Sequence, residues 1–416
     1  MGEGSLEAPS RHPLAWQDPE FLDEEKLDQE MRRQFDICHG CRRCFNLCDS
    51  FPRLFDLIDA SESEELDTVK SDDFKAVVEA CTLCDMCFLT KCPYVPPHEF
   101  NIDFPHLMLR ARASQSRKAG VPFGVKQLTK TDRNGRLARI WPAIVNWGSS
   151  CRNLFTRPLL ETVLDVHREA VLPQFHKQHF LSTTSLDRDN SLKTSNNGRK
   201  AVLYSTCFVN YNNPQIGIAA QAVLAKNGVQ TEVVYSRCCG MPQLEQGDVA
   251  AVADAAKATA RELSPWIEKG YSIIALIPSC ALMFKNEWPL IVEGDQNIER
   301  LSQATFDISE YIVDIAKNEG LTDGLAPLVG GITLHIACHA RAQNMGQKGA
   351  EMLRLIPNTD VQVIERCSGH GGSWGFMKET FEVGLKVGKP VARQAAKAAN
   401  GYLVSECPLA RDHILQ

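Results

Sequence analysis

Two runs of closely spaced cysteines stand near the start of the chain. Residues 38–48 read CHGCRRCFNLC, with thiols in the pattern C-x2-C-x2-C-x3-C, and residues 81–93 read CTLCDMCFLTKCP, with the pattern C-x2-C-x2-C-x4-C-P. Four-thiolate zinc sites usually combine two C-x2-C pairs, so two tight triplets that each carry a trailing cysteine fit zinc poorly. The spacing therefore favours iron–sulfur chemistry.

The two runs resemble the signature of bacterial two-cluster ferredoxins, in which the fourth cysteine of each run serves the other cluster. The resemblance implies two [4Fe–4S] clusters. The first would bind Cys38, Cys41, Cys44 and Cys92, and the second would bind Cys48, Cys81, Cys84 and Cys87. The sequence departs from the signature at Asp49, where proline is usual, and in the longer last gap of the second run. Neither departure removes a ligand.

The segment between the runs, residues 59–80, begins with acidic residues and continues with apolar ones at helical spacing. Such a pattern predicts a helix. It favours a helical ferredoxin module, of the kind found in fumarate reductase-type iron–sulfur subunits, over a compact two-hairpin ferredoxin.

Length and composition indicate a soluble globular chain of two or three domains. The chain has 416 residues, 44% of them hydrophobic, and a net charge of −6 that is spread unevenly. Residues 1–109 are acidic, 110–200 are basic and 201–416 are close to neutral. Sixteen cysteines without an export signal favour metal or redox chemistry over a disulfide framework. No apolar run is long enough to span a bilayer, so we expect a cytoplasmic protein.

The basic middle segment, residues 110–200, has no cysteine motif apart from the lone Cys151, which we expect to be buried. Arginines alternate there with Trp141, Trp147 and leucines at helical spacing. One interpretation is a helical linker that packs on its neighbours. The other is an amphipathic surface that lies on an anionic membrane or on a partner subunit. Residues 182–200 are polar and predict a hinge.

After residue 200, short apolar strands alternate with amphipathic helices, which is typical of an α/β layer fold. Each expected strand leads directly into a cysteine. The strands are AVLYSTC, TEVVYSRCC and SIIALIPSC, and then ITLHIAC, VQVIERC and GYLVSEC. Ligands in open α/β sheets gather beyond the carboxyl ends of the strands. The first three strands should therefore bring together Cys207, Cys238, Cys239 and Cys280.

The second group of strands repeats the first. The spacing from Cys207 to Cys238 is 31 residues, and the spacing from Cys338 to Cys367 is 29. Self-similarity of this kind predicts an internal duplication. We call residues 201–325 lobe 1 and residues 326–416 lobe 2.

The paired motifs resemble the cysteine-rich CCG domains of iron–sulfur proteins related to heterodisulfide reductase and to the C subunit of anaerobic glycerol-3-phosphate dehydrogenase. The resemblance covers roughly residues 35–416. It implies motifs of five cysteines that hold an iron–sulfur cluster in each domain. In lobe 1, Ile277 replaces one cysteine and four remain; in lobe 2, Ser368 and Ala410 replace two.

Lobe 1 should therefore hold a further iron–sulfur cluster, whereas lobe 2 keeps only Cys338, Cys367 and Cys407. Three thiols suffice for a cluster only with a serine, a histidine or an open iron. The sequence leaves this choice open. Three histidines flank the site, and we interpret each as structural rather than as a ligand: His335, His339 and His370.

The expected fold class is α+β multidomain, with a helical two-[4Fe–4S] ferredoxin module followed by two duplicated α/β lobes. The expected parts are an N-terminal extension (1–34), a ferredoxin-like head (35–109), the basic amphipathic linker (110–200), lobe 1 (201–325) and lobe 2 (326–416). The chain stops at DHILQ, inside an expected helix, which suggests a missing C-terminal piece.

No G-x-G-x-x-G motif follows a strand and no P-loop motif is present. The sequence thus favours an electron-transfer subunit of an oxidoreductase complex over the subunit that binds substrate. The resemblance implies anaerobic respiration: a flavoprotein dehydrogenase for glycerol-3-phosphate or a similar 2-hydroxy substrate as partner, quinone or another carrier as acceptor, and a peripheral place on the cytoplasmic membrane. Alternatives are an electron donor to a rubrerythrin-like peroxide reductase and a thiol–disulfide reductase subunit of the heterodisulfide type.

Overall fold

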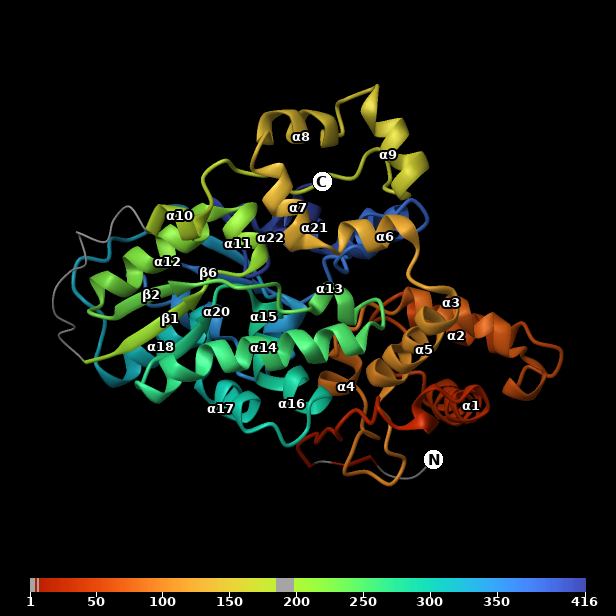
Figure 1. The fold of residues 1–416 in the computed structure, drawn as a ribbon. Helices are drawn as coiled ribbons and strands as arrows, with labels where there is room; N and C mark the ends of the chain where they lie inside the picture. The colour runs from red at the N-terminus through yellow and green to blue at the C-terminus, as the bar shows by residue number, and fades with distance from the viewer. Residues whose placement is uncertain (1–3, 6, 185–197) are drawn as a thin grey trace. The chain divides into compact units, whose positions relative to one another are not determined.

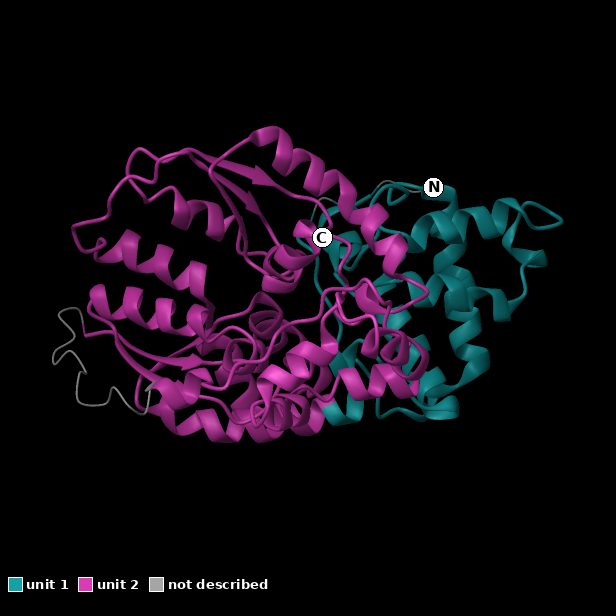
Figure 2. Cartoon of the chain, turned by 90° about the horizontal axis from the view of Figure 1, so that it is seen from above, with its two compact units in different colours: residues 1–121, 242–251 teal, residues 122–241, 252–416 magenta. Residues whose placement is uncertain are grey.

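The computed structural model describes residues 4–5, 7–184 and 198–416. Contacts between α-carbons divide the chain into two compact units, shown in Figure 2: unit 1 comprises residues 1–121 and 242–251, and unit 2 comprises residues 122–241 and 252–416. Many helices accompany two small parallel sheets (Figure 1), which confirms the expected α+β multidomain fold. No helix among the described residues has the length and apolar character that a membrane crossing requires.

The regular secondary structure described in residues 4–121 of unit 1 is entirely helical. Its elements are η1 (Pro19–Leu22), α1 (Glu24–Cys41), α2 (Ser50–Asp59), η2 (Leu66–Thr68), η3 (Ser71–Phe74), α3 (Lys75–Ala80), α4 (Met86–Thr90) and α5 (Phe104–Ala119). Asp23 caps α1 by accepting the Lys26 N–H, and Asp103 caps α5 in the same way.

Aromatic side chains from four of these helical segments form the core of unit 1. The rings of Phe35 and Phe74 meet edge to face at 5.1 Å, and those of Phe51 and Phe104 lie 4.6 Å apart. All four are almost fully buried. Aromatic pairs at these separations stabilise a core beyond the area that they bury. The core thereby fixes α1, α2 and α5 relative to one another.

The described part of the middle segment beyond residue 121 folds into short helices of unit 2. These are α6 (Phe123–Leu128), α7 (Thr131–Ala138), α8 (Pro142–Ser149), α9 (Thr156–Leu164) and α10 (Phe180–Thr184). The buried guanidinium of Arg157 donates to the carbonyls of Ser149, His167 and Ala170, which ties α8 and α9 to the chain that follows. Residues 185–197 of the expected hinge lie outside the described residues.

The expectation for Cys151 is wrong. Its side chain is exposed, because it stands in the turn between α8 and α9 rather than on the face that packs inward. Sequence alone did not place this turn.

Lobe 1 contains a four-stranded parallel sheet in the order β2-β1-β3-β4. The strands are β1 (Lys200–Tyr204), β2 (Gln230–Val234), β3 (Ser272–Ala275) and β4 (Thr305–Asp307). The helices and turns are α11 (Cys207–Tyr211), α12 (Pro214–Lys226), α13 (Met241–Leu244), α14 (Val249–Glu268), α15 (Pro278–Leu282), the π-helical turn η5 (Met283–Glu287), α16 (Trp288–Ile291), α17 (Gln296–Ala304) and α18 (Ile308–Asn318). The short strand β4 has no counterpart in the sequence prediction.

Lobe 2 contains a three-stranded parallel sheet in the order β6-β5-β7. Its elements are β5 (Ile332–His335), α19 (Cys338–Arg341), α20 (Lys348–Leu353), β6 (Val361–Ile364), η6 (Trp374–Phe376), α21 (Phe381–Ala398), β7 (Tyr402–Ser405) and α22 (Pro408–Leu415). The first strand of each lobe is central, with the second and third on either side of it. The common order confirms the duplication.

Candidate functional site

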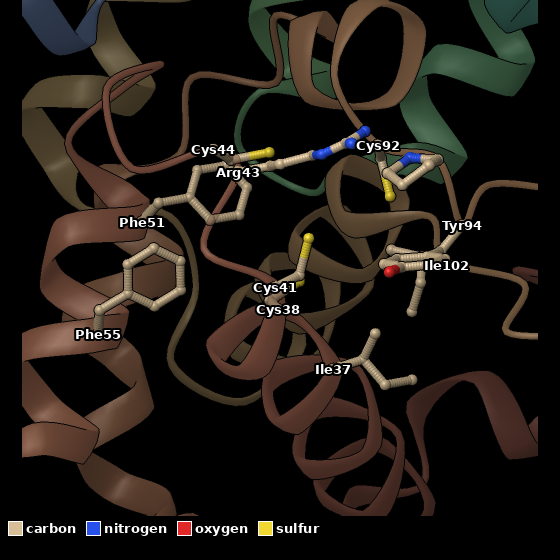
Figure 3. A pocket seen from close by; sticks show the side chains of 11 residues that line it. Ile37, Cys38, Cys41, Arg43, Cys44, Phe51, Phe55, Cys92, Tyr94 and Ile102 are labelled. Atoms are coloured by element: carbon tan, nitrogen blue, oxygen red, sulfur yellow. The ribbon is translucent and has the colours of Figure 1, made fainter. Parts of the chain in front are cut away.

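The first set of head cysteines lines one pocket. Cys38, Cys41, Cys44 and Cys92 line a pocket that is partly open to solvent, together with Phe51, Phe55 and Ile102. Figure 3 shows the sulfur atoms of Cys41, Cys44 and Cys92 pointing toward this common space. The first two cysteines lie on the last turn of α1, three residues apart and so on one helix face. A left-handed residue, Arg42 with φ of 51°, ends the helix and turns the chain toward Cys44.

Burial and crowding make these thiols poor acids on their own. Burial, and to a smaller extent the neighbouring thiols, raises the pKa of Cys44 to about 12 and that of Cys92 to about 11. The backbone N–H groups of Tyr94 and Val95 act in the opposite direction on Cys92. Cations would offset the repulsion among several thiolates held in one place. The pocket is therefore built for a positively charged group that binds sulfur.

The second set of head cysteines also lies together. Burial raises the pKa of Cys48 well above its ordinary value, and the charges of Cys84 and Cys81 raise it further. The pKa of Cys87 is raised by burial and then by Cys84, Cys81, Cys44 and Cys48. Cys44 belongs to the first set, so the two head sites are close enough to influence each other. Burial likewise raises the pKa of Cys81 to about 11.

Left-handed backbone shapes the second run. Leu83 has φ of 48° and Asp85 has φ of 60°, on either side of Cys84. Non-glycine residues adopt this conformation at a cost, so the surrounding structure must hold it. Asp85 is held by Arg11, whose guanidinium donates to both its carboxylate oxygens at 2.8 and 3.1 Å. Arg11 also pairs with Asp103, and in this way the N-terminal segment supports the second site.

Lobe 1 gathers its four cysteines at the carboxyl ends of its strands. Cys207 begins α11 just after β1, the pair Cys238 and Cys239 follows β2, and Cys280 lies in α15 after β3. The Cys207 and Cys238 sulfurs are 3.8 Å apart. Cys239 interacts in turn with Cys238 and with Cys280. At 3.8 Å two sulfurs can both reach one metal ion, because each metal–sulfur bond is about 2.3 Å long.

The hydrogen bonds among these thiols make Cys238 easier to deprotonate than Cys207 and Cys239. The pKa of Cys238 is well below its ordinary value because it accepts hydrogen bonds from Cys207 and Cys239. The pKa of each of these donors is raised well above its ordinary value for the same reason. The indole of Trp288 donates to the Cys239 carbonyl at 3.1 Å and fixes the peptide that carries the pair.

The middle segment supplies a group to the lobe 1 site that sequence reasoning did not assign. Asp132 of α7 accepts the Cys238 N–H at 2.8 Å with one carboxylate oxygen and the Tyr235 hydroxyl with the other. Burial raises the pKa of Asp132. Its neighbour Thr131 places a buried hydroxyl beside Cys207 and Cys238. No signal in the sequence links Thr131 and Asp132 to these cysteines, which lie far along the chain.

Lobe 2 brings its three cysteines together with a histidine. Cys338 donates to Cys367, which lowers the pKa of Cys367 to about 7, and the Gly369 N–H also donates to that sulfur at 3.3 Å. Cys407 lies 3.6 Å from Nε2 of His370. Burial raises the pKa of Cys407 to about 11 and lowers that of His370 to about 3, the latter with help from neighbouring histidines.

The other histidines of lobe 2 have different partners. Both nitrogens of His335 are engaged, Nδ1 with the Ser405 hydroxyl at 3.0 Å and Nε2 with the Arg366 carbonyl at 2.9 Å. Nδ1 of His413 lies 2.7 Å from the Ser368 carbonyl. Both ring nitrogens of His335 are thus occupied by hydrogen bonds to protein groups.

A hydrogen bond connects the two lobes between their thiol sites. The hydroxyl of Ser279 in α15 lies 2.7 Å from Nδ1 of His339 in α19. Ser279 precedes Cys280 of lobe 1, and His339 follows Cys338 of lobe 2. Gln343, two residues after α19, donates to the Pro278 carbonyl at 3.4 Å. Helix α15, which carries Cys280, and helix α19, which carries Cys338, are thus in direct contact.

The donor sets fit an iron–sulfur group. The head sites and lobe 1 offer thiols alone, and soft thiolate sets select zinc, copper(I) or iron–sulfur clusters. Among the residues that the structure describes, no three histidine, cysteine, aspartate or glutamate side chains are grouped as they would be around a single metal ion. The cysteines that the sequence assigned to the two head clusters fall into the same two groups in space.

Comparison with known proteins identifies the lobes. Residues 201–285 and 332–409 match the family described as cysteine-rich domain, CCG. Each lobe thus contains one segment that matches this family. Both begin at the first strand of a lobe and include all of its cysteines.

Three relatives place these domains among redox proteins. The C subunit of anaerobic glycerol-3-phosphate dehydrogenase from Escherichia coli (strain K12) is 25% identical over 285 residues, which are 67% of this chain and 69% of the relative. The B subunit of fumarate reductase (CoM/CoB) from Methanothermobacter marburgensis is 24% identical over 379 residues, or 85% and 71%. Lactate utilization protein A of Bacillus cereus (strain B4264) is 29% identical over 185 residues, or 42% and 74%. The chain is thus related to subunits of dehydrogenases and reductases, as its resemblance to the CCG proteins implied.

Proposed function

We propose that the protein is an iron–sulfur subunit that relays electrons between a flavoprotein dehydrogenase and quinone or another carrier. The observation that carries the proposal is the gathering of fifteen cysteines, scattered over the chain, into separate thiol groups in the head and in each lobe. Iron–sulfur clusters, when bound, supply one-electron transfer with potentials that the surrounding protein sets. A chain of such sites carries single electrons without binding the substrate.

The residues of this chain hold, shield and tune those sites. Eight head thiols would bind two [4Fe–4S] clusters, and the four thiols of lobe 1 would bind a further cluster. Phe51, Phe55 and Ile102 line the first head pocket and exclude water from one side of it. Arg43 and Lys91 lie close enough to Cys44 to favour its thiolate. The names of the relatives support a partner that oxidises glycerol-3-phosphate or a similar 2-hydroxy acid or alcohol.

A membrane surface is the docking site that we propose for the middle segment. Helices α6 to α9 leave large apolar side chains in solvent, among them Trp141 (66% exposed), Trp147 (61%) and Phe155 (88%). Arginines and lysines stand among them in the sequence. Exposed aromatic residues interspersed with cations match an anionic bilayer, where the rings enter the interface and the cations meet lipid phosphates. At that surface the protein would pass electrons to quinone in the bilayer.

Anaerobic purification of the full-length protein tests the relay. We expect more than about eight irons per chain with matching sulfide, because two [4Fe–4S] clusters alone account for eight, and paramagnetic signals on reduction. Cys92→Ser should remove one head signal. Cys151→Ser is the matched control, because Cys151 is exposed and lies in none of the thiol groups, and it should leave the iron content unchanged. Fewer than about eight irons, or zinc in their place, would contradict the head assignment.

Vesicle flotation tests the docking surface. The wild-type protein should bind vesicles of phosphatidylglycerol and phosphatidylcholine, and the double variant Trp141→Glu, Trp147→Glu should lose most of that binding. Val329→Glu is the control, because Val329 is 88% exposed and lies outside α6 to α9. Equal binding by all three proteins, or none by the wild type, would contradict membrane docking while leaving the relay intact.

A second candidate function is thiol–disulfide chemistry in lobe 1, which the 3.8 Å contact between Cys207 and Cys238 favours. Two thiols in contact can pass two electrons to a bound disulfide by exchange. The same iron determination separates the candidates. Under the relay, Cys207→Ser lowers the iron content; under thiol exchange, it leaves iron unchanged and removes a reversible disulfide.

A further inference from the structure

His370 stands in a loop that fixes which of its nitrogens carries the proton. The loop continues through Gly371 and Gly372, whose φ angles of 46° and 61° lie in the left-handed region that glycine adopts at little cost. This conformation turns the Gly372 N–H back onto the imidazole, where it donates to Nδ1 at 2.9 Å. On the other side of the ring, Nε2 lies 3.6 Å from the Cys407 sulfur.

The backbone donor settles the tautomer. A peptide N–H can only donate, so Nδ1 must be the acceptor and cannot carry a hydrogen. The neutral ring then carries its hydrogen on Nε2, the nitrogen that faces Cys407. A protonated ring would carry a hydrogen on both nitrogens, so a Nδ1 that accepts the Gly372 N–H also keeps the imidazole neutral. An imidazole that binds a metal through Nε2 would instead need its hydrogen on Nδ1, where it would meet the Gly372 hydrogen.

We propose that His370 is a positioning residue of lobe 2 that donates an Nε2–H hydrogen bond to the Cys407 sulfur, and is not itself a metal ligand. The inference rests on the proposed function, because it assigns Cys407 as one of the thiolates that hold an iron–sulfur group. Hydrogen bonds to cluster-binding sulfur withdraw negative charge from it and favour the reduced state. His370 therefore raises the reduction potential of the lobe 2 site.

The duplicated lobe provides an internal reference. Cys367, Ser368 and Gly369 of lobe 2 correspond to Cys238, Cys239 and Gly240 of lobe 1, so Met241 stands where lobe 2 has His370. A methionine thioether has no hydrogen to donate. Compared with lobe 1, lobe 2 therefore has a serine, Ser368, in place of a thiol and an N–H donor two residues later. Both differences lower the negative charge on the sulfurs of lobe 2.

The tautomer is measurable without any bound metal. The full-length protein, freed of metal and labelled with ¹⁵N-histidine, should give one neutral imidazole protonated on Nε2 that disappears in His370→Met. A resonance for His370 with the hydrogen on Nδ1, or a protonated ring at neutral pH, would overturn the proposal. The result of this NMR measurement does not depend on whether the protein relays electrons.

The potential is measured on the anaerobic, iron-loaded full-length protein. The lobe 2 signal is the one that Cys407→Ser removes. His370→Met should change its reduced-to-oxidised ratio at a fixed potential by about tenfold toward oxidised, which is a fall of ~59 mV for a one-electron couple. His370→Gln, which keeps a side-chain N–H donor, should restore part of the shift. Strong nitrogen hyperfine coupling in the wild type would instead show direct ligation and overturn the proposal.

His413→Gln is the matched control. His413 is buried in the same lobe, and its Nδ1 contacts the Ser368 carbonyl rather than a sulfur. The His413→Gln variant should keep the reduction potential of lobe 2 within error of the wild-type value. An equal fall in potential in His413→Gln and His370→Met would indicate a general change in the structure of the lobe and would contradict the specific role of His370. If lobe 2 alone lacks iron, the inference fails while iron in the head and lobe 1 still supports the relay.

Discussion

Lobe 1 and lobe 2 order their first three strands in the same way, but different groups lie beside their cysteines. Each places a central first strand between the second and third, and each ends its strands in cysteines. Lobe 1 reads CCGM after its second strand, and lobe 2 reads CSGH. The groups beside the cysteines also differ: in lobe 1 the carboxylate of Asp132 accepts the backbone N–H of Cys238, and in lobe 2 Nε2 of His370 lies 3.6 Å from the Cys407 sulfur.

The comparison teaches that one duplicated scaffold can present two electrically different thiol sites. A carboxylate beside thiolates disfavours added negative charge, whereas an N–H donor favours it. The lobe 1 site should therefore have the lower reduction potential of the two, and electrons should pass spontaneously from lobe 1 to lobe 2.

The largest expected effect comes from placing in lobe 1 the serine that lobe 2 has at the equivalent position, Ser368. Cys239→Ser removes a buried thiol that interacts with both Cys238 and Cys280. We expect lobe 1 to lose its iron–sulfur group and the iron content to fall by roughly the share of one cluster, about four irons, measured by iron and sulfide analysis. Cys151→Ser should keep the full content. A Cys239→Ser protein with unchanged iron would contradict the assignment of lobe 1.

The reciprocal change, Ser368→Cys, gives lobe 2 the missing thiol. Ser368 is buried at the position equivalent to Cys239. We expect the lobe 2 signal to change its shape and its iron to survive a chelator at least about tenfold longer, because a fourth thiolate is added. The lobe 1 signal should stay the same and serves as the internal control. Unchanged retention would mean that residue 368 does not face the bound group.

A smaller effect is expected from Asp132→Asn, which removes charge from the lobe 1 site without changing the size of the side chain. The negative charge of Asp132 interacts with Cys238 and opposes the addition of an electron to a group bound there. We expect the lobe 1 potential to rise in a redox titration and so to approach that of lobe 2. Asp314→Asn, a change on α18 in contact with Arg199, should leave it unchanged. A fall in the lobe 1 potential would reverse our ordering of the two sites.

The smallest effect concerns the contact between the lobes. Ser279→Ala removes the hydrogen bond to His339, and such a bond contributes about 1 kcal/mol to stability. The free energy of unfolding should fall by that amount in denaturant titrations, while the iron content and both potentials stay the same. A loss of iron from either lobe would show instead that the contact positions the cysteines.

The sequence predicts the parts of these sites that depend on strand ends and on cysteine spacing. The convergence of Cys207, Cys238, Cys239 and Cys280 follows from the rule that parallel strands end at one edge, and the two head groups follow from the ferredoxin signature. Asp132 could not be predicted, because it reaches Cys238 through the folding of α7 and no spacing rule connects them. The tautomer of His370 depends on a backbone N–H two residues away, and the exposure of Cys151 depends on a turn.

Iron and sulfide analysis of Cys207→Ser, Cys338→Ser and the wild type, each purified anaerobically at full length and titrated by EPR, tests the central claim most directly. We predict that the wild type contains more iron than the roughly eight atoms of the two head clusters. Each variant should lose one EPR signal. The signal that depends on Cys207 should be reduced at the lower potential. A wild-type content of about eight irons that neither variant changes would contradict the claim that the two lobes hold distinct iron–sulfur sites.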